Sequence, residues 1–113
     1  MAHSSPNVRQ MSVQELQQRL QGGDAFRLID VREPAEHAIA RIEQAELHPL
    51  SQVQTWMPQL RPDEDLVFFC HGGMRSQQIA AYLVHQLGFT KVANLVGGID
   101  EWSVVVDPAV PRY

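Results

Sequence analysis

The chain has 113 residues, of which 44% are hydrophobic, so it can bury the core of one domain and has no room for a second. Thirteen acidic residues against nine basic ones give a net charge of −4, and no Lys/Arg cluster opposes the resulting repulsion of nucleic acids. The single cysteine, Cys70, excludes an internal disulfide framework and a metal site of several thiolates, which suits a reducing compartment. No apolar run approaches the ~18–20 residues that a membrane span needs. We therefore expect a cytoplasmic protein with no membrane or nucleic-acid partner.

The N-terminal third of the chain predicts a tail, a helix and a strand. Residues 1–7 are small and polar and are expected to form a flexible tail, so that a single domain covers 8–113. Ser12-Val13-Gln14-Glu15 fits a capping box that opens a helix, which Gly22-Gly23 ends. Residues 26–31 form a short apolar run with a β-branched bias, which is typical of a buried strand.

The middle of the chain predicts two helical starts before a second strand. Glu33-Pro34 marks a turn in which Pro is tolerated in a first helical turn. Ser51 is positioned to cap a further helix, which Pro58 should kink or end early. Asp63-Glu64-Asp65 is a polar turn, and it leads into the strongly strand-like run Leu66-Val67-Phe68-Phe69.

The last third continues the alternation of strands and helices. Apolar residues recur at helical spacing from Ile79 to Leu87, and Gly88 is a suitable C-cap. A strand over 91–95 and a short helix over 99–104 follow. This order predicts an α/β fold with a largely parallel sheet, in which ligands collect at the carboxyl ends of strands. Cys70 lies at such an end.

The segment that follows the second strand is the strongest candidate for a reactive site. Between Cys70 and Arg75, the pair Gly72-Gly73 allows a tight arc with φ angles above zero, so that backbone N–H groups curl around the sulfur. These amides, the N-terminus of the next helix and Arg75 should lower the pKa of the thiol and make it nucleophilic. The alternative is an inert core cysteine, which would need neither the glycines nor the arginine.

The loop Cys70-His71-Gly72-Gly73-Met74-Arg75-Ser76 resembles the active-site loop of the rhodanese family. Two further segments, Leu28-Ile29-Asp30-Val31-Arg32-Glu33 and Gly97-Gly98-Ile99-Asp100-Glu101-Trp102, resemble other signatures of this family in the same order. The resemblance covers the chain from Val8 onward and implies a three-layer α/β/α domain with about five mainly parallel strands. It also implies a thiosulfate sulfurtransferase that carries a persulfide on Cys70. The histidines show no ligand spacing, so no metal is assigned, and no cofactor is expected. A small-molecule sulfur donor would be bound by His71, Gly72, Gly73, Met74, Arg75 and Ser76.

The spacing within the loop bears on the alternatives. Four residues separate Cys70 from Arg75, as in rhodaneses, whereas the related cell-cycle phosphatases have five and hence a wider cradle. A thiolate-based phosphatase or arsenate reductase and a non-catalytic rhodanese-like binding module remain the rival functions. The acceptor of the sulfur would be cyanide, a thiol or a sulfur-carrier protein, because the chain has no second cysteine that could resolve a persulfide.

Other polar residues are assigned supporting roles. Asp30 and Arg32 match the family's Asp-Val-Arg signature, and Asp30 is expected to cap backbone amides or pair with an arginine. His71 and Met74 should shape the rim of the pocket, since a histidine adjacent to the cysteine on a curling loop is poorly placed to act as its base. Residues 40–45 depart from the family pattern, because two glycines and a proline are absent there, so that the turn needs different backbone angles.

Overall fold

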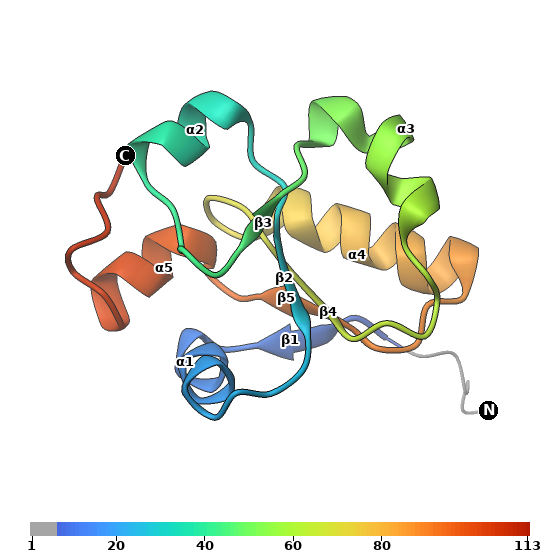
Figure 1. The fold of residues 1–113 in the computed structure, drawn as a ribbon, viewed down its shortest axis with the longest axis horizontal. Helices are drawn as coiled ribbons and strands as arrows, with labels where there is room; N and C mark the ends of the chain where they lie inside the picture. The colour runs from blue at the N-terminus through green and yellow to red at the C-terminus, as the bar shows by residue number, and fades with distance from the viewer. Residues whose placement is uncertain (1–6) are drawn as a thin grey trace.

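A single parallel sheet forms the centre of the computed structural model, which describes residues 7–113 (Figure 1). The predicted flexible tail falls almost entirely on residues 1–6, which lie outside this range. The sheet has the order β1-β5-β4-β2-β3, and every neighbouring pair is parallel. Its strands are β1 (Arg9–Met11), β2 (Arg27–Asp30), β3 (Glu46–Leu47), β4 (Leu66–Phe69) and β5 (Val92–Leu95). The prediction of an α/β fold with about five mainly parallel strands is therefore confirmed.

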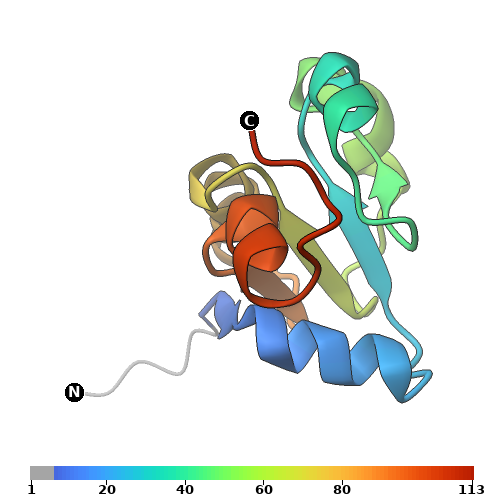
Figure 2. The same ribbon diagram turned by 90° about the vertical axis from the view of Figure 1, so that its left-hand side faces the viewer.

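Helices cover both faces of the sheet. On one face lie α1 (Val13–Gln21) and α5 (Gly98–Val105), and on the other lie α3 (Val53–Trp56) and α4 (Met74–Leu87), as Figures 1 and 2 show. The remaining helix is α2 (Pro34–Ile39). Side chains of a strand alternate between faces, so Phe68 packs toward α4 while Phe69 packs toward α5. Cys70, one residue on, belongs to the α4 face.

The helix expected to begin at Ser51 differs from the prediction. The segment consists of a 3₁₀ turn over Leu50–Gln52, the short α3 and a second 3₁₀ turn over Met57–Gln59. Ser51 does not cap a helix, because its hydroxyl donates to Oε1 of Glu33 at 2.5 Å. Pro58 lacks an amide hydrogen, and α3 ends at Trp56, as the sequence suggested.

The other helix boundaries follow the sequence signals. Ser12 is the N-cap of α1 and accepts a hydrogen bond from the amide of Glu15 at 3.1 Å, and Gly88 ends α4 with a φ of 74°. The turn over residues 40–45 uses ordinary backbone angles, since no non-glycine residue of the described range has a positive φ. Within that range, no helix is long and apolar enough to cross a membrane.

Candidate active site

The loop that carries Cys70 connects β4, at the centre of the sheet, to α4, and the N-terminus of α5 holds this loop in place. The first amides of α5 donate to this loop: Ile99 N–H to the carbonyl of Cys70 at 3.0 Å, and Asp100 N–H to that of His71 at 3.1 Å. Gly98 has a φ of 60°, and a Cβ there would overlap both carbonyl oxygens. The glycine is therefore required for the close approach of the two backbones.

The sulfur of Cys70 is surrounded by hydrogen-bond donors. The residue is 1% exposed, and its Sγ accepts from the amide of Gly73 at 3.1 Å and lies 3.4 Å from Oγ of Ser76. Burial by itself would raise the pKa of the thiol. Hydrogen bonds from the Ser76 hydroxyl and from the amides of Ser76, Gly73 and Arg75 outweigh burial, and the pKa of Cys70 is lowered. The geometry thus favours a thiolate, which is the nucleophilic form.

The two glycines of the loop have different structural roles. Gly73 has a φ of 109° and is the N-cap of α4, and a Cβ on it would lie 3.5 Å from the backbone of both Leu95 and Gly97. The prediction of a positive φ is wrong for Gly72, which has none and would carry a Cβ into open space. Its exposed position leaves the mouth of the loop unobstructed.

Arg75 is held beside the loop by an ion pair that the sequence did not suggest. Its Nη1 and Nη2 donate to the two carboxylate oxygens of Glu36 on α2, at 2.7 and 2.9 Å. The pKa of Glu36 is lowered to about 2, above all by this arginine, and the pKa of Arg75 is raised by the carboxylate. The amide of Arg75 contributes to the lowered pKa of Cys70, and the guanidinium of Arg75 acts on the thiolate through space. At 37% exposure, the guanidinium remains accessible to an anion.

Asp30 and Arg32 form a fully buried pair behind the loop. Nε and Nη2 of Arg32 donate to the two oxygens of Asp30 at 2.9 and 2.7 Å, and both side chains are 0% exposed. Arg32 also donates to the carbonyls of Glu36 at 3.2 Å and Ala40 at 2.6 Å. It thereby fixes α2 and the carboxylate that holds Arg75.

A third element reaches the site from the C-terminal segment, which runs back to α2 in Figures 1 and 2. The Tyr113 hydroxyl donates to Oε2 of Glu36 at 2.8 Å and accepts from Nη1 of Arg32 at 2.9 Å. Its ring meets that of His71 edge-on, with centroids 4.4 Å apart. The structure thus places His71 against Tyr113, and Met74, which is 78% exposed, at the rim.

Sequence reasoning missed Glu36, Tyr113 and Asn94. Asn94 lies in β5, is 4% exposed, and its Oδ1 accepts from the hydroxyl of Ser76 at 2.6 Å. A signal for it was present, because a polar residue between Ala93 and Leu95 in a buried strand requires a partner. Glu36 and Tyr113 carried no comparable signal, since both contacts depend on how distant segments come together.

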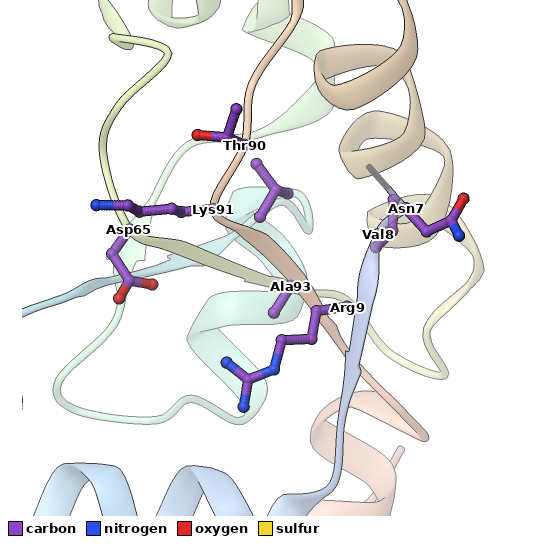
Figure 3. Close-up of a pocket in the computed structure, with 8 residues that line it drawn as sticks. Asn7, Val8, Arg9, Asp65, Thr90, Lys91 and Ala93 are labelled. Carbon is purple, nitrogen blue, oxygen red and sulfur yellow. The ribbon is translucent and has the colours of Figure 1, made fainter. Parts of the chain in front are cut away.

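Two hollows lie at opposite ends of the sheet. The one beside the loop has a volume of about 490 Å³ and is lined by Gly73, Met74 and Asn94, among others. The other lies at the amino ends of the strands, where Arg9, Asp65 and Lys91 line it (Figure 3). In parallel α/β sheets ligands bind at the carboxyl ends, so the hollow beside the loop is the candidate site. No group of three or more metal-ligating side chains occurs within residues 7–113.

Comparison with known proteins assigns the family. The model of the rhodanese-like domain matches residues 12–104. A sulfurtransferase of Allochromatium vinosum is 38% identical, with 85% of this chain and 89% of that protein covered. The Rhodanese-like/PpiC domain-containing protein 12 of Arabidopsis thaliana is 41% identical over 94% of this chain, which spans 38% of that protein's length. The crystal structure of a rhodanese-related protein from Thermoplasma volcanium superposes with a TM-score of 0.76 at 27% identity, covering 93% of this chain and 99% of that one. The chain belongs to the rhodanese-like domain family.

Proposed function

We propose that the chain is a sulfurtransferase that takes a sulfane sulfur from a donor such as thiosulfate, holds it as a persulfide on Cys70 and passes it to a thiophilic acceptor. The observation that carries the proposal is the buried sulfur of Cys70 within a ring of N–H and O–H donors, with a lowered pKa. A thiolate held in this way is an activated nucleophile without a neighbouring general base.

In the first step, the Cys70 thiolate attacks the outer sulfur of thiosulfate. A sulfur–sulfur bond to Cys70 forms, the sulfur–sulfur bond of thiosulfate breaks, and sulfite leaves with the electron pair. The persulfide and sulfite together carry the same charge as the thiolate and thiosulfate did. The loop amides stabilise the negative charge on sulfur throughout, in the manner of an oxyanion hole.

Arg75 is the group best placed to bind the sulfonate end of the donor. Its guanidinium offers a planar fork of donors and lies at the mouth of the loop, partly exposed. Glu36 already occupies two of those donors. A bound dianion would therefore share Arg75 with Glu36 or displace it, which makes the affinity for the donor depend on this carboxylate.

In the second step, the acceptor attacks the outer sulfur of the persulfide and restores the Cys70 thiolate. Cyanide leaves as thiocyanate, whereas a thiol, either free or carried by a sulfur-carrier protein, loses its proton and leaves as its persulfide. Gly72 at an open position and Met74 at the rim leave room for such an acceptor. The two displacements predict ping-pong kinetics.

Steady-state kinetics with thiosulfate and cyanide test this proposal. When both concentrations are varied, wild type should form thiocyanate with parallel double-reciprocal lines, Cys70→Ser should be inactive, and Arg75→Ala should raise the KM for thiosulfate. Arg41→Ala removes an arginine that pairs with Glu43 on the surface and should leave the rate unchanged. Intersecting lines, or full activity of Cys70→Ser, would contradict the mechanism.

The rival functions give different results in the same preparation. Four residues separate Cys70 from Arg75, which favours a single sulfur over a tetrahedral phosphate. Cys70-dependent hydrolysis of p-nitrophenyl phosphate without thiocyanate formation would establish phosphatase chemistry instead. A well-folded protein that performs neither reaction with any sulfane donor would be a binding module.

A further inference from the structure

A chain of polar side chains runs from the sulfur of Cys70 to the surface. Ser76 Oγ lies 3.4 Å from the sulfur and donates to Oδ1 of Asn94 at 2.6 Å. Nδ2 of Asn94 donates to Oε1 of Gln10 at 3.4 Å, and Nε2 of Gln10 donates to Oε1 of Gln77 at 2.8 Å. Ser76 and Asn94 are buried, while Gln10 is exposed in the hollow beside the loop.

The Ser76 hydroxyl has one proton and three acceptors within reach. These are Oδ1 of Asn94, the carbonyl of Gly73 at 3.2 Å and the sulfur of Cys70. A hydroxyl donates to one acceptor at a time, and the contact with Asn94 is the shortest of the three. With its proton toward the sulfur, Ser76 supplies the hydrogen bond that lowers the pKa of Cys70; with its proton on Asn94, as the shortest contact indicates, it withholds that bond. A thiol can then donate its own proton to Ser76 Oγ, but a thiolate would face a lone pair.

The amide of Asn94 can present either end to Ser76. With Oδ1 toward Ser76, every bond of the chain points outward, from Ser76 through Asn94 and Gln10 to Gln77. If the amides turn over, Nδ2 of Asn94 donates to Ser76, and the serine proton is released from Asn94 and can bind a thiolate at Cys70, the charged one of its two remaining acceptors. The same heavy-atom positions support both directions, since amide nitrogen and oxygen have nearly the same shape.

We propose that Asn94 is a positioning residue that sets the direction of the Ser76 hydroxyl and thereby the stability of the Cys70 thiolate. The inference rests on the proposed function, because it assigns Asn94 a part in preparing the nucleophile. The outward direction suits the protonated thiol, and the inward direction suits the thiolate. Successive hydrogen bonds polarise one another, so the exposed amide of Gln10 affects the buried sulfur.

Charged groups around the sulfur must be kept unchanged in any test. From the elements packed around the loop these are Asp30 at the end of β2, Arg32 after that strand, Glu36 of α2, Arg75 of α4, Asp100 of α5, and the titratable His71 and Tyr113. Gln10 and Asn94 make none of the hydrogen bonds found among these groups. Variants at residues 10 and 94 therefore leave the ion pairs intact.

Gln10→Glu tests the chain from its exposed end. A carboxylate only accepts, so it binds Nδ2 of Asn94, turns Oδ1 toward Ser76 and withholds the serine proton from the sulfur. The thiol pKa, measured from the ultraviolet absorbance of the thiolate with Cys70→Ser as the blank, should rise by about one unit. Gln78→Glu places the same charge in the same hollow without the bond to Asn94 and should shift it far less. Equal shifts for the two variants would overturn the proposal.

Asn94→Asp tests the chain from its centre. The Asp carboxylate should hold the serine proton and raise the thiol pKa by more than one unit, and the rise should become much smaller in a Ser76→Ala background. An equal rise in both backgrounds would show a charge acting through space and would overturn the proposal. If Asn94→Asp does not fold, the shift of the thiol pKa in Gln10→Glu, a variant at an exposed position, tests the role of Asn94 instead. This titration needs no sulfur donor, so a protein that passes it without forming a persulfide would contradict the proposed function alone.

Discussion

Replacing Glu36 with glutamine removes the charge from the ion pair that holds Arg75 beside the loop. Glutamine keeps the size of the side chain and can still accept one hydrogen bond from the guanidinium. The bidentate contacts of 2.7 and 2.9 Å are reduced to a single neutral one. The variant should therefore lose stability while its fold and its core remain intact.

The size of the loss follows from the pKa of Glu36. A pKa of about 2 against an ordinary 4.5 would correspond to about 3 kcal/mol if the pair were shielded from water. Because 22% of Glu36 and 37% of Arg75 are exposed, solvent screening reduces the expected loss to about 1–2 kcal/mol. Since the Glu36 carboxylate also competes with thiosulfate for the Arg75 guanidinium, the KM for thiosulfate should fall in the same variant.

The dependence on pH separates the charge from other effects of the substitution. The folded-state pKa of Glu36 is depressed, so its contribution to stability is complete above about pH 4.5 and is lost as the pH falls toward about 2. Urea unfolding of wild type and Glu36→Gln should therefore differ most near neutral pH and converge under acid conditions.

A surface carboxylate provides the matched control. Glu43→Gln removes a charge that is 80% exposed and pairs with Arg41, and it should change the unfolding free energy by less than about 0.5 kcal/mol at every pH. The reasoning would be refuted if Glu36→Gln matched this control near neutral pH. A loss of stability that did not diminish in acid would equally refute it, since it could not come from the charge.

Three further substitutions test the supports of the site. Gly98→Ala should lower the unfolding free energy by about 2–4 kcal/mol, measured in urea, because its Cβ overlaps the backbone of the thiol-bearing loop at a φ of 60°. Asp30→Ala leaves the Arg32 guanidinium buried and unpaired and should cost about 3–5 kcal/mol, seen as a lower Tm. Arg75→Lys loses the planar fork and should raise the KM for thiosulfate, whereas the thiol pKa of Cys70 should change little because the amide of residue 75 remains.

Each of these substitutions has a counterpart at a position without the same contacts. Gly88→Ala at a φ of 74° meets no neighbour within 4 Å and should cost only about 1 kcal/mol. Asp63→Ala alters an exposed turn and should leave Tm nearly unchanged. Arg41→Lys should leave the KM unchanged. Equal effects for a test variant and its counterpart would contradict the role assigned to that residue.

Most helices and strands could be predicted because the sequence signals for them are local. Ser12 before an apolar stripe, the glycines that end helices and the apolar run 66–69 each act over a few residues. The helix at Ser51 was misjudged because the serine hydroxyl binds Glu33, 18 positions earlier. A short-range pattern cannot anticipate a partner that tertiary structure supplies.

The site could be predicted only as far as its loop. The position of Cys70 at the end of β4 and the arc of amides followed from the strand and the glycines. The engagement of Arg75 with Glu36, the contact of Tyr113 with both α2 and the loop, and the link from Ser76 to Asn94 join separate elements. These contacts depend on the packing of the layers, which no spacing in the sequence encodes.

The most direct test of the account is the intact mass of the protein after incubation with thiosulfate. We predict that wild type gains one sulfur atom, that cyanide removes it as thiocyanate, and that Cys70→Ser gains nothing. Wild type that remains unmodified with thiosulfate and with a persulfide donor, or a gain in mass that persists in Cys70→Ser, would contradict the claim that Cys70 carries the sulfur.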